Sequence, residues 1–232
     1  MRHLVVSPHP DDAEIGMGGL IHKLRSAGEF VTIAICTGNG DVHMVHSDQT
    51  VAFQRRRDEQ LVAREFLLRP DIEFLDLAPA SRFDSVEQAD FVIAFDGLFP
   101  RYDVIYGPLP SYNSDHNRVW ETMQAAFRPG RLDGKTYYAY EQPFGNRYPD
   151  WGKTYVQLAP EDVGAKCSAI SAHKSQMEGR MGSIYGPHAA TQFASLRGKE
   201  VGVLYAELFY LVRSAQLISR TDTISDRKAL RA

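Results

Sequence analysis

The stretch LVVSPHPDDAEIGMGGLIHKLRSAGEFVTIAIC, residues 4–36, decides the fold class. Its first apolar run, at 4–6, predicts a short strand. Residues 14–27 predict a helix, because their apolar and small side chains fall on one helical face and Gly28 ends the pattern. Residues 30–36 form a nearly continuous apolar run, which is typical of a parallel strand covered on both faces.

The alternation of strands and helices continues along the chain. Further strands are expected at 72–75, 103–106 and 136–141. Further helices are expected at about 49–67, 86–99, 116–127, 160–176 and 200–215. This order predicts a Rossmann-like, doubly wound α/β fold, in which a mostly parallel sheet carries helices on both faces.

The chain contains no linker long enough to divide it. We therefore expect a single domain over residues 1–215 and a polar C-terminal tail over 216–232. Of the 232 residues, 44% are hydrophobic and 24% are charged, as in ordinary globular proteins. The formal net charge of −3 argues against a nucleic-acid-binding protein, because such proteins usually carry a clear basic excess.

Three further features of the sequence predict a cytoplasmic protein. No apolar run is long enough to cross a bilayer, and residues 1–6 lack the apolar region and cleavage site of a signal peptide. Cys36 and Cys167 are far apart and lack metal-binding spacing, so we expect both to be reduced, packed thiols.

Three polar residues, His9, Asp11 and Asp12, follow the first predicted strand directly. In open parallel sheets, ligands bind beyond the carboxyl ends of the strands, so this position is on the functional rim. An imidazole and two carboxylates suit a divalent ion, and zinc accepts both kinds of ligand. Because adjacent aspartates point in different directions, one can ligate the ion while the other acts as a base. The alternative is an exposed turn before an acidic helix N-terminus, which is the simpler interpretation of Glu14.

A third ligand is expected from the end of another strand. Residues 107–119 follow the strand predicted at 103–106 and lie on the same rim. Within them His116 stands at a loop-to-helix junction and is the best candidate. A lone histidine is more often structural than a ligand, but its position relative to His9 and Asp12 favours a metal site.

The two motif segments, PHPDDAEIGMGG at 8–19 and NSDHNRV at 113–119, resemble those of the LmbE/PIG-L family. This family consists of zinc-dependent de-N-acetylases that act on N-acetylglucosamine-containing conjugates. Three further segments also match the family pattern: Arg56-Arg57-Asp58-Glu59, His173-Lys174-Ser175-Gln176 and Ala206-Glu207-Leu208-Phe209. The matches run in order from residue 4 to about residue 209.

The resemblance implies that His9, Asp12 and His116 hold one Zn²⁺ ion, with other divalent ions as alternatives, and that Asp11 is the general base. It further implies a small-molecule amino-sugar conjugate as the binding partner. Neither nucleic acid nor a membrane span is expected. Family members are often oligomeric, so a homo-oligomer is one of the states to test.

Asn113 departs from the family pattern, because many members have a histidine there. Its amide can donate a hydrogen bond to an oxyanion but cannot titrate, so we expect a catalytic role limited to donation. Asp115 is expected to orient a ligand or the loop on the substrate side. Arg56 and His43 are the other expected substrate-binding residues. A solvated helix face is the alternative for Arg56, and a surface or pocket-wall position is the alternative for His43.

These observations predict a zinc-dependent hydrolase that removes the N-acetyl group from an N-acetylglucosamine-type conjugate. Two alternatives stay open from the sequence. One is a related metal hydrolase acting on a non-sugar amide or an ester. The other is a non-catalytic member of the family that binds a sugar or a nucleotide.

Overall fold

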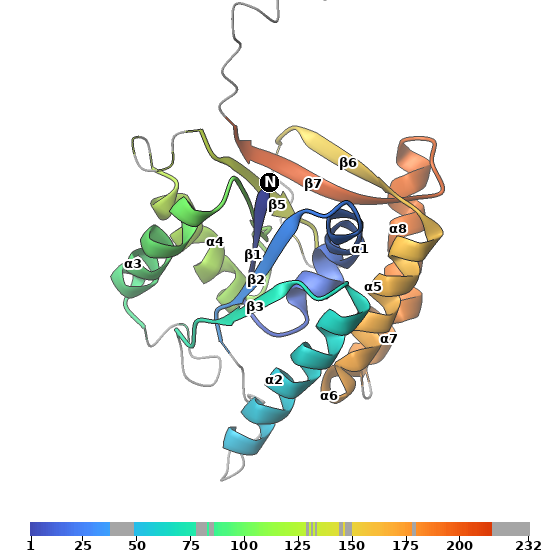
Figure 1. Cartoon of the computed structure of the whole chain (residues 1–232), viewed down its shortest axis with the longest axis horizontal. Helices are drawn as coiled ribbons and strands as arrows, with labels where there is room; N and C mark the ends of the chain where they lie inside the picture. The colour runs from blue at the N-terminus through green and yellow to red at the C-terminus, as the bar shows by residue number, and fades with distance from the viewer. Residues whose placement is uncertain are drawn as a thin grey trace, which may run out of the picture.

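The structure, a computed structural model, describes residues 1–37, 49–77, 83, 86–128, 130, 132, 134–143, 146, 150–177 and 180–214 (Figure 1). Its centre is a seven-stranded sheet in the order β3-β2-β1-β4-β5-β7-β6. The strands are β1 Arg2–Ser7, β2 Phe30–Ile35, β3 Asp71–Phe74, β4 Val104–Pro108, β5 Thr136–Tyr140, β6 Lys153–Leu158 and β7 Tyr205–Arg213. The pairs from β3 across to β5 are parallel, whereas β7 pairs antiparallel with both β5 and β6.

Helices cover both faces of this sheet. They are α1 Asp12–Ser26, α2 Gln49–Phe66, α3 Gln88–Leu98, α4 Ser114–Ala126, α5 Pro160–Ala172, α6 Lys174–Met177, α7 Arg180–Tyr185 and α8 Pro187–Glu200, with the short 3₁₀ helix η3 Phe99–Arg101. In Figure 1, α3 and α4 lie on one side of the sheet and α1, α2, α5 and α8 on the other. The arrangement confirms the predicted doubly wound, mostly parallel α/β fold in a single domain.

Alternate residues of β1 point to opposite faces of the sheet and pack into two different core clusters. Leu4 and Val6 pack in one cluster with residues of α3 and α4, such as Phe95 and Met123. Val5 points to the opposite face and joins a second cluster that contains residues of α1, α2 and α5. This alternation with burial on both faces explains why the sequence of the parallel strands is apolar almost throughout.

The C-terminal part of the fold differs from the expectation. The helix expected at 200–215 is instead strand β7, and β6 was not expected at all. The segment YAELFYLVR is rich in aromatic and branched residues, which favour strands, and β7 is paired on both sides. Its residues from Ala206 to Tyr210 are buried whichever face of the sheet they point to. The helix expected at 160–176 is interrupted at His173, between α5 and α6.

Helix α1 packs very closely on the sheet and is kinked. A Cβ atom on Gly16 would lie 2.3 Å from Cδ2 of Tyr140, so only glycine fits there. Met17 has non-helical angles (φ −146°, ψ 25°), and the backbone N–H groups after the kink donate to Glu207, from Gly19 at 3.0 Å and from Leu20 at 2.8 Å. The carboxylate of Glu207 thus caps the second half of α1.

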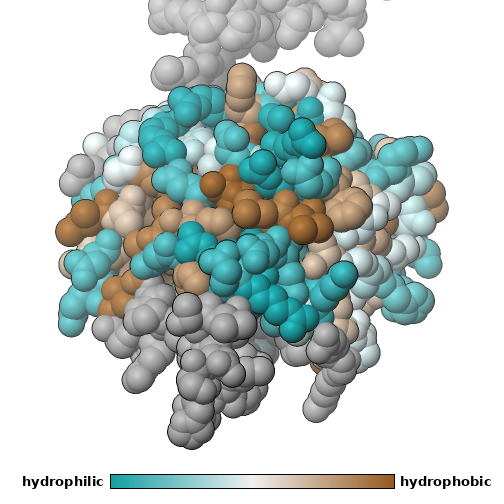
Figure 2. All heavy atoms as spheres, turned by 60° about the horizontal axis from the view of Figure 1, so that its bottom comes forward, coloured by the Kyte–Doolittle hydropathy of each residue, from teal (hydrophilic) through white to brown (hydrophobic). Residues whose placement is uncertain are grey.

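The surface of the described residues is mixed. Figure 2 shows a hydrophobic band that crosses one face of the molecule between two hydrophilic areas. Among the helices that the structure describes, none combines the length and the apolar character that a membrane span requires.

Candidate metal centre and active site

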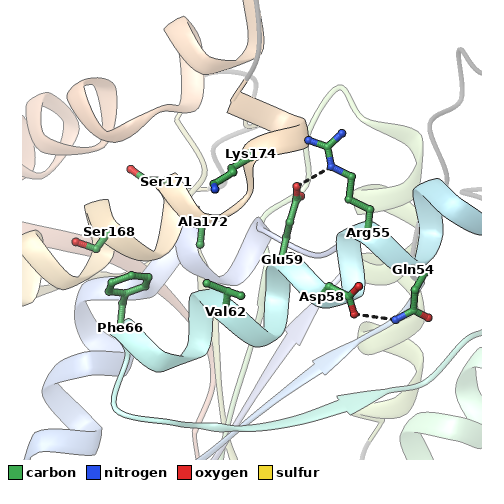
Figure 3. A pocket seen from close by; sticks show the side chains of 10 residues that line it. All are labelled: Gln54, Arg55, Asp58, Glu59, Val62, Phe66, Ser168, Ser171, Ala172 and Lys174. Carbon is green, nitrogen blue, oxygen red and sulfur yellow. Dashed lines mark hydrogen bonds and ion pairs between the residues drawn. The ribbon is translucent and has the colours of Figure 1, made fainter.

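A groove of about 760 Å³ lies between α2 and α5, on the outer side of α2 (Figure 3). Its walls include the apolar side chains of Val62, Phe66 and Ala172. At its edge Glu59 accepts hydrogen bonds from the backbone and the hydroxyl of Ser175, at 2.9 and 2.6 Å. None of the candidate metal ligands lines this groove, so the groove is not the candidate metal site.

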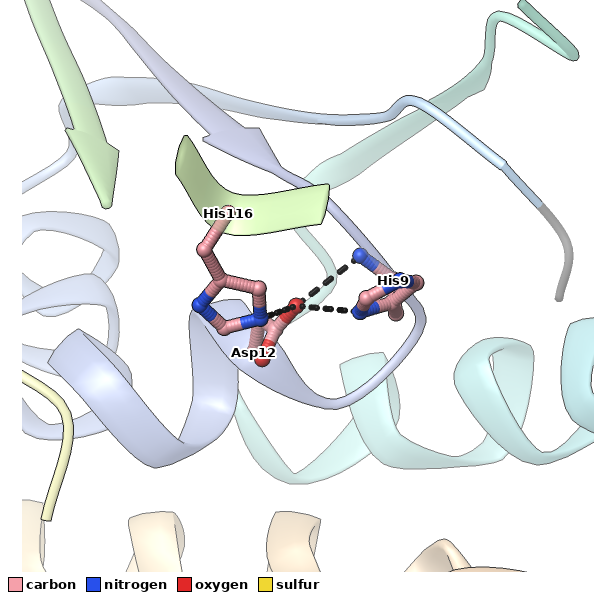
Figure 4. A group of neighbouring side chains, drawn as sticks. All are labelled: His9, Asp12 and His116. Carbon is pink, nitrogen blue, oxygen red and sulfur yellow. Dashed lines mark hydrogen bonds and ion pairs between the residues drawn. The ribbon is translucent and has the colours of Figure 1, made fainter. Parts of the chain in front are cut away.

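The candidate ligands meet where β1 and β4 end. These strands are parallel neighbours, so the segments that follow them lie side by side. His9 follows β1, Asp12 opens α1 and His116 lies in the first turn of α4. All three side chains are buried, and one potential ligand atom from each lies within 4.8 Å of the others (Figure 4).

Within this cluster the carboxylate of Asp12 contacts both histidine rings. Oδ2 of Asp12 lies 3.2 Å from Nδ1 of His9 and 3.2 Å from Nε2 of His116. Nε2 of His9 pairs at 2.9 Å with Oδ2 of Asp115. When this nitrogen donates to Asp115, the lone pair of Nδ1 faces Asp12 and His116, which is the tautomer that a metal ligand needs.

Asp12 is held in the cluster by contacts from several elements. The backbone N–H of His9 donates to its Oδ2 at 2.9 Å. Its other oxygen, Oδ1, accepts from Nε2 of Gln142 at 2.8 Å. Gln142 is 7% exposed and follows β5, the strand next to β4. The carboxylate is therefore oriented before any ion binds.

The electrostatics of the cluster call for a cation. Burial alone would lower the pKa of His9, but its hydrogen bonds with Asp115 and Asp12 outweigh burial and raise this pKa to about 9. Burial alone would raise the pKa of Asp12, but His116 and His9 hold it well below its usual range. Two imidazole nitrogens and one ionised carboxylate are the donor set of many catalytic zinc sites, so these residues fit a divalent ion.

Asp11 lies beside the cluster in a strained backbone conformation. Its φ of 103° is rarely adopted by a residue with a side chain, and such conformations cost on the order of 1–3 kcal/mol. Oδ2 of Asp11 accepts from Nη2 of Arg56 at 3.2 Å. Burial raises the pKa of Asp11 to about 6. The positive charge of Arg56 lowers this pKa, and the negative charge of Asp12 raises it.

Arg56 is buried, with 6% of its surface exposed, and so does not lie on a solvated helix face. Its Nη2 also donates to the carbonyl oxygen of Pro10 at 2.6 Å. Arg56 therefore contacts the loop that carries the candidate base. His43, the other residue expected to bind substrate, lies outside the described residues.

Asn113 is the N-cap of α4. Its Oδ1 accepts from the backbone N–H groups of Asp115 at 2.9 Å and His116 at 3.4 Å. Asparagine is among the residues most favoured at this position. Its side-chain oxygen is thus used to start the helix that carries His116, which leaves the Nδ2 group as its donor.

Two glutamines around the site did not emerge from the sequence, whereas His173 belongs to a segment that matches the family pattern. Gln60 contacts Asp11 and Glu14, Gln142 contacts Asp12, and His173 lies near Glu14. Two signals were available: Gln60 follows Arg56 by four residues on one helical face, and Gln142 follows a strand next to β4.

Fold and site together define the class: an α/β protein with a candidate metal centre at the carboxyl ends of its parallel strands. The chain belongs to the PIG-L family, described as GlcNAc-PI de-N-acetylase, whose family model matches residues 4–127. The matched segment contains every candidate metal ligand and Asp11. A search of curated proteins found no match.

Solved structures share the fold over nearly the whole chain. One is N,N'-diacetylchitobiose deacetylase from Pyrococcus horikoshii with an inhibitor, at 23% identity and a TM-score of 0.68, covering 96% of this chain and 88% of that one. The zinc-inhibited form of teicoplanin deacetylase Orf2 has 16% identity and a TM-score of 0.72, covering 94% and 100%. The 4-carboxy-2-hydroxymuconate hydratase GalB from Pseudomonas putida KT2440 has 22% identity and a TM-score of 0.72, also covering 94% and 100%.

Proposed function

We propose that this protein is a zinc-dependent deacetylase that hydrolyses the N-acetyl group of an N-acetylglucosamine-type conjugate. The observation that carries the proposal is the convergence of His9, Asp12 and His116, with Asp11 beside them, inside the segment that matches the de-N-acetylase family. Deacetylases among the structures of the same fold support it. GalB has the same fold and a different reaction, so the fold by itself does not decide the activity.

In this proposal His9, Asp12 and His116 hold the ion. When bound, Zn²⁺ would lower the pKa of a coordinated water and polarise the acetamide carbonyl. Asp115 fixes the tautomer of His9 by accepting from its Nε2, and Gln142 fixes the orientation of Asp12 through Oδ1. In these roles the two residues act through the ligands.

Asp11 takes the proton from the attacking water and returns it to the departing amine. Its carboxylate lies beside the candidate ligands and accepts a hydrogen bond from Nη2 of Arg56 at 3.2 Å, so the proton acceptor is held next to the position of the ion.

Asn113 and Arg56 complete the proposed site. The Nδ2 group of Asn113 is a hydrogen-bond donor for the oxyanion and cannot supply a proton. Arg56 touches Asp11, and with His43 it is our candidate for contact with the hydroxyl groups of the substrate.

The test is release of acetate from a matched panel by the zinc-loaded protein. The panel contains N-acetylglucosaminides with different aglycones, an O-acetylated sugar and a non-sugar N-acetyl amide. We expect release from the N-acetylglucosaminides, loss of release with a chelator, and recovery when zinc is added back. Release only from the ester or from the non-sugar amide would contradict the proposed substrate class, and no release from any compound would contradict the proposed activity.

A further inference from the structure

Gln60 of helix α2 reaches behind the candidate base into the interior. Its side chain is fully buried and makes two hydrogen bonds there. Its Oε1 accepts from the backbone N–H of Asp11 at 3.3 Å, and its Nε2 donates to Oε1 of Glu14 at 2.5 Å. A single amide thus joins the turn that carries Asp11 to the first turn of α1.

The backbone that Gln60 contacts is the strained one. A left-handed conformation at a non-glycine residue persists only where the surroundings fix it from several sides. Here Gln60 binds the N–H of Asp11, and Arg56, one helical turn earlier on the same face, binds the carbonyl oxygen of Pro10 and the carboxylate of Asp11. Helix α2 therefore contacts this turn at its backbone donor, its backbone acceptor and its side chain.

Glu14, the second partner of Gln60, is itself enclosed. Glu14 and His173 are both fully buried, and Nε2 of His173 lies 3.7 Å from Oε2 of Glu14. The ring nitrogens of His173 make no hydrogen bond within the described part of the chain, and the carboxylate of Glu14 faces one of them. A line of buried polar groups thus runs from Asp11 through Gln60 and Glu14 to His173, the residue between α5 and α6.

We infer that Gln60 is a positioning residue for the deacetylation proposed above, on which this inference rests. It holds Asp11 in the left-handed conformation, so that the carboxylate of Asp11 is directed to the reacting water, whereas Asp12 is held by its own contacts with His9 and Gln142. Gln60 does not touch substrate or ion. Its loss misplaces the base and leaves the three ligands in position, which separates turnover from metal binding.

The first variant is Gln60→Met, which keeps the length of the side chain and removes both hydrogen bonds. We expect zinc stoichiometry and KM to stay close to wild type, while kcat falls about 10- to 100-fold. The matched control is Gln54→Met on the exposed face of the same helix, which keeps the wild-type kcat. A wild-type kcat for Gln60→Met would overturn the inference.

An exchange of the two partners tests the hydrogen bonds themselves. Gln60→Glu alone sets two carboxylates against each other at the contact with Glu14, and kcat should fall at least as far as in Gln60→Met. Adding Glu14→Gln places an amide at position 14 opposite the carboxylate at position 60, so the hydrogen bond between the two side chains can form again with donor and acceptor exchanged. The carboxylate at position 60 still accepts from the backbone N–H of Asp11. We expect the double variant to regain about tenfold in kcat over Gln60→Glu. A double variant no better than Gln60→Glu would overturn the inference.

A readout without turnover separates this inference from the proposed function. In crystal structures of the zinc-loaded proteins, we expect Asp11 of Gln60→Met to leave the positive-φ conformation or its carboxylate to move by about 1 Å or more. An unchanged Asp11 would contradict the role of Gln60. If the wild-type protein released no acetate from any compound, the proposed function would fail, and this comparison would still decide what Gln60 does.

Discussion

The N-terminal, parallel half of the molecule and its C-terminal, partly antiparallel half contribute differently to the site. The first half, up to the end of α4, supplies all three candidate ligands, Asp11 and Asp115. The second half supplies groups that hold the first in place: Gln142 on Asp12, Glu207 on the kinked helix α1, and His173 beside Glu14. The family match at 4–127 covers the first half only.

The two halves of the molecule therefore have different roles in the site. Chemistry-bearing residues gather at the ends of parallel strands, where loops converge. The residues that orient them come from distant elements that pack against those loops. Changes to the candidate ligands and to Asp11 in the first half should therefore abolish metal binding or turnover, and changes to the supporting residues of the second half should weaken metal binding or stability.

The largest effect is expected for His116→Ala. Removing one of three ligands should abolish stoichiometric zinc binding and lower kcat/KM by about 10³-fold or more. Metal analysis of the purified variant and an acetate-release assay measure both. His188→Ala, which changes an exposed histidine on α8, is the matched control and should keep full zinc and activity. A His116→Ala protein with one tightly bound zinc would contradict the assigned ligand set.

A smaller effect is expected for Gln142→Met in the second half. This change leaves all three ligands present and removes the 2.8 Å hydrogen bond that orients Asp12. Loss of such a partner typically weakens metal affinity by about 10- to 100-fold, so activity should return at high zinc concentration. Competition with a chelating dye measures the zinc Kd. Gln157→Met, exposed on β6, is the control, and an equal Kd in both variants would refute the role of Gln142.

Glu207→Gln should affect stability and leave zinc affinity unchanged. Lys166 and Glu207 form a buried ion pair at 2.6 Å, each with 4% exposure. Removing one charge leaves Lys166 buried without a carboxylate, which typically costs about 3–5 kcal/mol in the free energy of unfolding. Urea unfolding measures the change. Glu200→Gln, which breaks the exposed pair with Arg197, should cost less than about 1 kcal/mol, and similar losses in both variants would contradict this explanation.

The smallest effect concerns the packing of α1. In Gly16→Ala the new Cβ would lie 2.3 Å from the Tyr140 ring, so overpacking should cost about 1–3 kcal/mol in the free energy of unfolding. Gly97→Ala in α3 meets no atom within 4 Å and should instead stabilise the protein by up to about 1 kcal/mol. Thermal unfolding of the pair checks the opposite signs, and a stabilised Gly16→Ala would show that α1 can move away from the sheet.

The sequence predicted most of the parallel half and much less of the rest. The helical periodicity of α1 stands between two short apolar runs, which became β1 and β2, and the ligands follow strand ends, so both the fold and the cluster could be anticipated. Strand β7 was mistaken for a helix because a strand buried on both faces shows no alternation between polar and apolar residues. Its identity depends on pairing with β5 and β6, which the local sequence does not contain.

The supporting contacts were hidden for the same reason. Gln60 and Gln142 meet Asp11 and Asp12 across separations of 49 and 130 residues. Glutamine carries no charge and belongs to no metal-ligand pattern, so nothing local marks it as part of a site. Asn113 could be recognised as a departure from the family pattern, but its use as the N-cap of α4 became visible only with the helix boundary.

The most direct test of the central claim is a comparison of zinc content and turnover in Asp11→Asn. The amide cannot accept the proton from water, and the three ligands are unchanged. We predict that the variant keeps most of its zinc while kcat for acetate release falls about 10²- to 10⁴-fold. A fully active Asp11→Asn protein would show that Asp11 is not the base, and a variant that loses its zinc would show that Asp11 belongs to the ligand set.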